Sequence, residues 1–169
     1  MVYLGDRYLK PAVHKKRFLA AFQNSYGTKS VKPKLIVKGL NLLDACLDSD
    51  GTIIPGKTTL MITSDKLEAL KFLLGIINSK VAFYYLKEKY PASSYNQGTT
   101  FTKDMINDLP VPRLTDQGGG KVVTFVENIL ATIEKNPEAD ISILQDKLNK
   151  HIYDLYGLTE KEIKIVNDA

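Results

Sequence analysis

Amide and hydroxyl side chains gather in one polar stretch, between two segments that have stronger structural signals. The stretch begins after Pro91, which ends a helical pattern, and it is rich in turn-forming residues. Asn and Gln are the side chains that can pair bidentately with adenine in the DNA major groove. The candidates for contact with DNA bases are Ser94, Tyr95, Asn96, Gln97, Thr99 and Thr100. A polar linker between two helices would have the same composition, so that alternative stays open.

Rigid elements are predicted on both sides of this stretch. Thr102 is placed to cap a short helix that follows it, and the LPVP segment after that helix must be extended. On the N-terminal side, Asp65 and Glu68 form a capping-box pattern that opens a leucine-rich helix. Ser79 can cap a second helix that runs to Tyr90. The polar stretch is therefore expected to connect two helices.

Positive charge is concentrated near the N-terminus. Residues 1–40 contain nine lysines and arginines against one acid, a net charge of +8, whereas the remaining residues have a net charge of −4. Such asymmetry favours contact between the N-terminal third and a polyanion. The candidates for phosphate contact are Arg7, Lys15, Lys16, Arg17, Lys34, Lys38, Lys57 and Lys103. A solvated basic face is the alternative.

The segment GTIIPGKT, residues 51–58, matches the phosphate-loop pattern of nucleotide-binding proteins. That chemistry requires a helix to begin at Lys57, so that the helix N-terminus faces the phosphates. The residues that follow, TTLMITS, are rich in β-branched side chains and predict a strand instead. We interpret the segment as a hairpin that imitates the pattern, and we expect no nucleotide hydrolysis.

No other residues combine into a catalytic or metal-binding pattern. His14 lies among lysines without a second ligand, His151 lies within a predicted helix as a packing residue, and Cys46 is expected to be a small buried side chain. Glu162 and Lys164 faintly resemble a nuclease pattern, but such sites lie on strands and these residues lie on a helix. We expect neither a cofactor nor a metal ion in this chain.

The predicted fold class is α+β. A small, mostly antiparallel sheet of three or four strands is expected within residues 34–63, followed by a helix pair and a C-terminal helical hairpin. The glycine run at residues 118–120 is the best internal boundary. It separates an expected recognition domain, residues 1–114, from a helical tail, residues 121–169. The tail carries six basic and nine acidic residues, so it is not expected to face a polyanion.

Composition favours a soluble protein of the cytoplasm. The single cysteine excludes an internal disulfide bond, and no apolar run is long enough for a membrane span. The first residues, VYLGDRYLK, lack the pattern of a signal peptide.

Three segments resemble a known family. They are the helix ending LLGIINSK at residues 73–80, the polar loop with its short helix and LPVP at residues 96–112, and HIYDLYGLTEKEI at residues 151–163. Together with KLIVKG, they are similar to the TaqI-like C-terminal specificity domain. That domain is the target-recognition part of type IIG restriction–modification enzymes and related adenine-specific DNA methyltransferases. The second segment also resembles type I specificity subunits.

The resemblance implies an α+β domain that grips double-stranded DNA in the major groove and has no catalysis of its own. The methyltransferase motif and the glycine motif of such enzymes do not occur in this sequence. The chain is therefore expected to be the C-terminal portion of a larger enzyme, or to act with the methyltransferase and nuclease domains of a partner subunit. The parent enzyme would use S-adenosylmethionine and Mg²⁺. The alternative is a protein–protein docking module of a type I-like specificity subunit.

Overall fold

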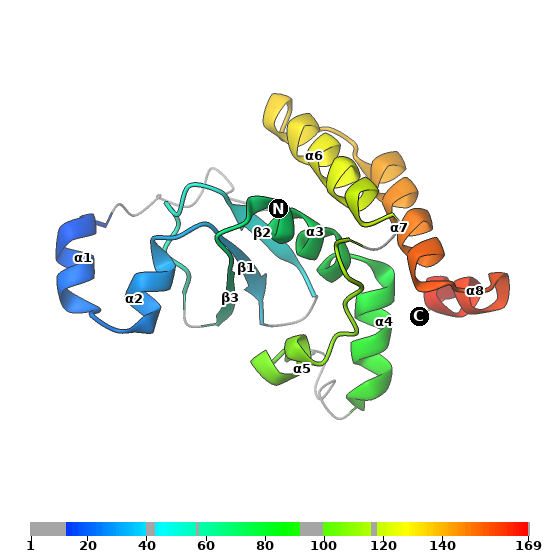
Figure 1. The fold of residues 1–169 in the computed structure, drawn as a ribbon, viewed down its shortest axis with the longest axis horizontal. Helices are drawn as coiled ribbons and strands as arrows, with labels where there is room; N and C mark the ends of the chain where they lie inside the picture. Colours follow the sequence, from blue (N-terminus) through cyan, green and yellow to red (C-terminus); the bar gives the residue numbers. More distant parts are fainter. Residues whose placement is uncertain (1–12, 40–42, 57, 92–99, 116–117, 169) are drawn as a thin grey trace.

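The computed structural model describes residues 13–39, 43–56, 58–91, 100–115 and 118–168. It has a three-stranded antiparallel sheet and helices on either side of that sheet along the chain, which confirms the α+β class. In Figure 1 the molecule is elongated, with α1 at one end and α8 at the other. The elements are α1 (Lys15–Ala21), α2 (Ser25–Ser30), β1 (Lys34–Lys38), β2 (Ala45–Asp48), β3 (Thr59–Thr63), α3 (Leu67–Ile77), α4 (Lys80–Lys89), α5 (Lys103–Asn107), α6 (Gly119–Lys135), α7 (Ser142–Tyr156) and α8 (Glu160–Asp168).

The sheet has the order β2-β1-β3, with β1 in the centre and antiparallel to both neighbours. Leu35 and Val37 alternate along β1 and are fully buried, where α3 packs on the sheet. The prediction of a hairpin at residues 51–58 is wrong. Both β2 and β3 pair with β1, so the connection between them passes from one edge of the sheet to the other. The TIIP segment within it, a candidate fourth strand, is not a strand either.

Local capping signals set several of the helix ends. The Ser79 side chain accepts a hydrogen bond from the Ala82 N–H at 3.2 Å, and this cap separates α3 from α4 as predicted. The predicted capping box at Asp65 is wrong, because α3 begins after Lys66 and has no side-chain cap. Asp65 is exposed and lies 3.9 Å from Lys32 instead.

The C-terminal helices form a hairpin of α6 and α7 that packs on α3 (Figure 1). Gly75 in α3 permits this close approach, since a Cβ there would lie only 2.7 Å from the Val122 side chain. Gly157 ends α7 in the left-handed region, at φ 66°. A capping box starts α8, because Glu162 accepts hydrogen bonds from the Thr159 N–H and hydroxyl, each at 2.7 Å.

One hydrophobic core runs from the sheet into these helices. It includes Leu35 of β1, Leu70 of α3, Val122 of α6 and Ile152 of α7. His151 is half-buried beside Phe125 and donates from Nε2 to the Gly118 carbonyl at 2.9 Å, which fits the packing role expected for it. Among the described residues no single helix is long and apolar enough to cross a membrane; only α3 and α4 together, bent by 63°, reach that length and composition.

Candidate nucleic-acid interface

Three segments that lie far apart in the sequence meet at Gly39, just beyond the end of β1. The Gly39 N–H donates to the Thr58 carbonyl at 3.1 Å, and the Gly39 carbonyl accepts from the Phe101 N–H at 2.9 Å. A Cβ at this position would lie 2.7 Å from the Thr58 oxygen, so only glycine fits without a backbone shift. The backbone therefore joins the end of β1, the residue before β3 and the C-terminal end of the polar stretch.

Helix α5 begins directly after this junction. Thr102 caps it as predicted, because its hydroxyl accepts a hydrogen bond from the Met105 N–H at 3.3 Å. Phe101, Met105 and Leu109 are buried and attach the segment to the core. The exposed side chains around the junction include Lys38, Thr58, Thr100, Thr102, Lys103 and Asp104, and we call the first five of these the Gly39 surface.

The start of the polar stretch is also tied to its end, by a polar cluster between α4 and α5. The Tyr90 hydroxyl donates to Asp108, the Lys89 ammonium lies 3.2 Å from the same carboxylate, and Lys89 also donates to the Tyr85 hydroxyl at 3.0 Å. Hydrogen bonds from Tyr90 and Lys89 hold the pKa of Asp108 below its usual value. The same contact with Asp108 raises the pKa of Tyr90. Both flanks of the polar stretch are therefore fixed relative to each other.

Among the candidates for phosphate contact, five cations are described and exposed. Lys38 and Lys103 lie at the Gly39 surface, whereas Lys15, Lys16 and Arg17 lie on α1. Phe18 anchors α1 through ring contacts with Phe22 and Tyr26, and Tyr26 donates to the Pro55 carbonyl at 2.7 Å. Figure 1 shows α1 at one extremity of the molecule, away from α5. The exposed cations therefore form two separate groups.

The prediction that Lys34 contacts phosphate is wrong. Its side chain is fully buried, and its ammonium pairs with Asp48 and donates to the Ser30 carbonyl at 2.8 Å. Asp48 also accepts from the backbone N–H groups of Thr52 at 3.0 Å and Ile53 at 2.9 Å. Burial alone would raise the pKa of Asp48, but the hydrogen bonds from Lys34, Ile53 and Thr52 outweigh it and hold that pKa below its usual value. A buried ammonium with these partners is not accessible to DNA.

Several predicted residues lie outside the described part of the chain. They are the base-contact candidates Ser94, Tyr95, Asn96, Gln97 and Thr99 and the phosphate-contact candidates Arg7 and Lys57. Thr100 is the one base-contact candidate that is described, and it is exposed beside Phe101.

Thr58 belongs to the Gly39 surface, although the sequence pointed to it only as the last residue of the phosphate-loop pattern. Its place here depends on the backbone pairing with Gly39, for which the sequence has no local signal. The strand prediction after that pattern is confirmed, because Thr59–Thr63 is the strand β3 and not a helix.

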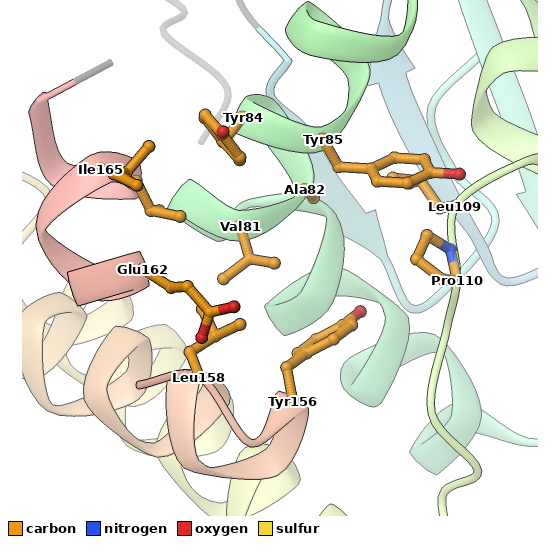
Figure 2. A pocket seen from close by; sticks show the side chains of 11 residues that line it. Val81, Ala82, Tyr84, Tyr85, Leu109, Pro110, Tyr156, Leu158, Glu162 and Ile165 are labelled. Carbon is orange, nitrogen blue, oxygen red and sulfur yellow. The ribbon is translucent and has the colours of Figure 1, made fainter. Parts of the chain in front are cut away.

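A second feature is a pocket of about 300 Å³ between α4, the residues after α5 and the start of α8 (Figure 2). Its lining is mostly apolar, with Val81 at its base and the rings of Tyr84, Tyr85 and Tyr156 around it. Burial raises the pKa of Tyr156 to about 12. The only carboxylate in the lining, Glu162, is engaged in the cap of α8.

Among the described residues, no three His, Cys, Asp or Glu side chains are grouped so that they could hold a metal ion. Cys46 is half-buried on β2, and burial raises the pKa of its thiol. A thiol with a raised pKa is a poor nucleophile at neutral pH. These observations leave the Gly39 surface, which is polar and cationic, as the candidate interface.

Comparison with known families gives no matching family model, and no curated protein matches the chain. The resemblance to TaqI-like specificity domains therefore rests on the sequence segments quoted above.

Proposed function

We propose that this chain is a sequence-specific DNA-recognition module, the C-terminal specificity domain of a type IIG restriction endonuclease or adenine DNA methyltransferase. The observation that carries the proposal is the Gly39 surface. It combines two exposed ammonium groups with three hydroxyl groups, on a backbone that hydrogen bonds fix to the end of the polar stretch. Cations beside the fixed end of a polar segment suit DNA reading, because phosphate contacts position a protein while base contacts specify the sequence.

In this proposal the two kinds of residue have different tasks. Lys38 and Lys103 bind phosphates beside the loop, and the cations of α1 add phosphate contacts farther along the duplex. The polar stretch, including Asn96 and Gln97, contacts base edges in the major groove. The tyrosines of α4 do not belong to this surface, since Tyr84, Tyr85 and Tyr90 pack against the hydrophobic core.

The module has no catalysis of its own in this proposal. Methylation and cleavage belong to catalytic domains of the same polypeptide or of a partner subunit. Those domains would bind S-adenosylmethionine and Mg²⁺, and the described residues offer no grouped ligands for a metal ion. The complex would act on DNA in the cytoplasm.

Salt-dependent DNA binding is the first test. We expect the chain to bind a mixed pool of duplexes weakly, with a log–log salt slope of about −4 to −5 if four to six phosphates are neutralised. Lys38→Ala and Lys103→Ala should each reduce that slope by about one. Lys161→Ala, which removes an exposed charge on the distant helix α8, is the matched control and should leave the slope unchanged. Fluorescence anisotropy across a salt series measures all four proteins.

Absence of binding at about 50 mM salt would contradict the proposal, since phosphate contacts are strongest at low salt. Equal slopes for Lys38→Ala and Lys161→Ala would show that the Gly39 surface is not the interface. Selection from randomised DNA by the intact enzyme then tests base reading. Gln97→Ala should relax the preference at one base pair, by about 1–3 kcal/mol of discrimination, without a change in salt slope.

A further inference from the structure

Strand β2 lies at an edge of the sheet, and the sheet register shows which of its backbone groups face outward. The Lys38 N–H donates to the Asp44 carbonyl at 2.8 Å. Because hydrogen-bonded pairs alternate along an antiparallel ladder, Cys46 and Asp48 also direct their backbone groups toward β1. Ala45 and Leu47 therefore direct their N–H and C=O groups away from the sheet.

The side chain of Asn78 forms hydrogen bonds with both outward backbone groups of Ala45. The Asn78 amide accepts from the Ala45 N–H at 2.8 Å and donates to the Ala45 carbonyl at 2.9 Å. These are the two bonds that a neighbouring strand would supply. Within the described part of the chain, no residue bonds to the outward groups of Leu47. Among the described residues, the outward backbone groups of Ala45 are therefore hydrogen-bonded, whereas those of Leu47 remain available to a partner strand.

A groove of about 880 Å³ runs along this open edge. Its near wall includes Leu47 and its far wall is formed by α6, the connection to α7 and the start of α7. Leu130, Ile133 and Ile141 are partly exposed in that wall. An extended chain that paired with Leu47 would thus lie beside an apolar surface able to bury every second side chain.

The charges around the groove are unequal. Among the described residues, the carboxylates of Asp44, Glu138 and Asp146 line it, against the ammonium of Lys80. Glu138 and Asp146 are exposed at the rim. A negative rim favours an occupant with lysine or arginine side chains.

We propose that this groove binds an extended basic peptide of another protein, which adds as a strand to the edge of β2 at Leu47. Backbone hydrogen bonds to Leu47 supply the pairing, β-branched or leucine side chains fill the apolar wall, and basic side chains face the acidic rim. The inference stands apart from DNA recognition, because none of the groove residues belongs to the Gly39 surface or to α1.

Selection from a library of displayed peptides on the full chain tests the proposal. We expect enriched peptides to alternate apolar and other residues over at least four positions and to carry net positive charge. A synthetic peptide of the enriched sequence is then N-methylated at one residue at a time. Strand addition predicts that N-methylation abolishes binding at the peptide residue that pairs with Leu47 and is tolerated at the two residues beside it, whose N–H groups face away from β2.

Paired charge reversals identify the groove. Glu138→Lys combined with Asp146→Lys should weaken the peptide by about fivefold to tenfold, since each exposed pair contributes up to about 1 kcal/mol. Asp154→Lys combined with Glu160→Lys makes the same charge change on exposed residues outside the groove and should leave the affinity unchanged. DNA binding of both double variants should respond equally, which separates this proposal from the previous one.

Three results would overturn the inference. The first is a selection that enriches no peptide or only acidic ones. The second is N-methylation that abolishes binding at adjacent peptide residues alike, or at none. The third is an equal effect of the two double variants on peptide affinity.

Discussion

The two ends of β1 carry the same residue type in opposite environments. At the first end, Lys34 is fully buried and every partner of its ammonium lies within the protein. At the other end, four residues along the same strand, Lys38 is exposed beside Gly39, where three segments are joined by backbone hydrogen bonds alone. One lysine is used to close the structure and the other is left accessible to solvent.

The difference shows how charge on one strand can be divided between folding and binding. A buried ammonium requires a carboxylate and further hydrogen bonds to offset its lost hydration, and Asp48 and the Ser30 carbonyl provide them. An exposed ammonium keeps its hydration and contributes little to stability, so it remains available for a phosphate. Net charge alone treats the two lysines as equal, although only one of them can contact a ligand.

Removing the buried lysine should have the largest effect on the free energy of unfolding. Lys34→Ala leaves the Asp48 carboxylate buried without its counter-charge, and we expect a loss of about 3–5 kcal/mol in the free energy of unfolding. Lys38→Ala, the matched variant at the exposed end, should change it by less than about 0.5 kcal/mol. Urea unfolding of both variants measures the contrast. Equal losses for the two lysines would contradict the division between the ends.

A smaller effect is expected from Gly39→Ala. The added methyl group would lie 2.7 Å from the Thr58 carbonyl oxygen, so the junction must shift, at a cost of about 1–3 kcal/mol. Gly56→Ala is the control, because nothing lies within 4 Å of a Cβ at that position. Thermal unfolding compares the two variants. A Gly39→Ala protein as stable as Gly56→Ala would show that the junction is not rigid.

The smallest effect concerns acid stability. The pKa of Asp48 is lower in the folded state than its unfolded value of about 3.9, so the pair stabilises the protein fully above that value. This contribution decreases as the pH falls below about 4 toward the folded pKa. Asp48→Asn should therefore be less stable than the original protein at pH 7, and the gap should narrow in acid. Urea unfolding between pH 7 and pH 3 tests this, and a constant gap would exclude the linkage.

Local signals in the sequence were sufficient for the fold class and for several helix ends. Ser79 and Thr102 each accept a hydrogen bond from the N–H group three residues further along, so these two predictions were confirmed. Asp65 shows the limit of such signals. It has the type and spacing of a cap, but the helix begins one residue later and the side chain points to solvent.

Long-range pairing could not be predicted from the sequence. The burial of Lys34 depends on Asp48, which lies fourteen residues away across the ladder. The hairpin prediction failed for the same reason, because the partner of β3 is β1 rather than the strand before it. Of the candidate interface, Lys38 and Lys103 were identified from charge, whereas their meeting through Gly39 depends on backbone bonds between distant segments.

The β2-β1-β3 order also sets the sequence of events during synthesis on the ribosome. Residues 34–48 emerge before the third strand and contain both strands of the β1–β2 pair. This pair can therefore form while the rest of the chain is still being translated. The second side of β1 then stays unpaired until residues 59–63 emerge. Because the Gly39 junction also requires Phe101, it is completed later still, after α3 and α4 have been made. The candidate interface is thus among the last parts of the sheet region to assemble.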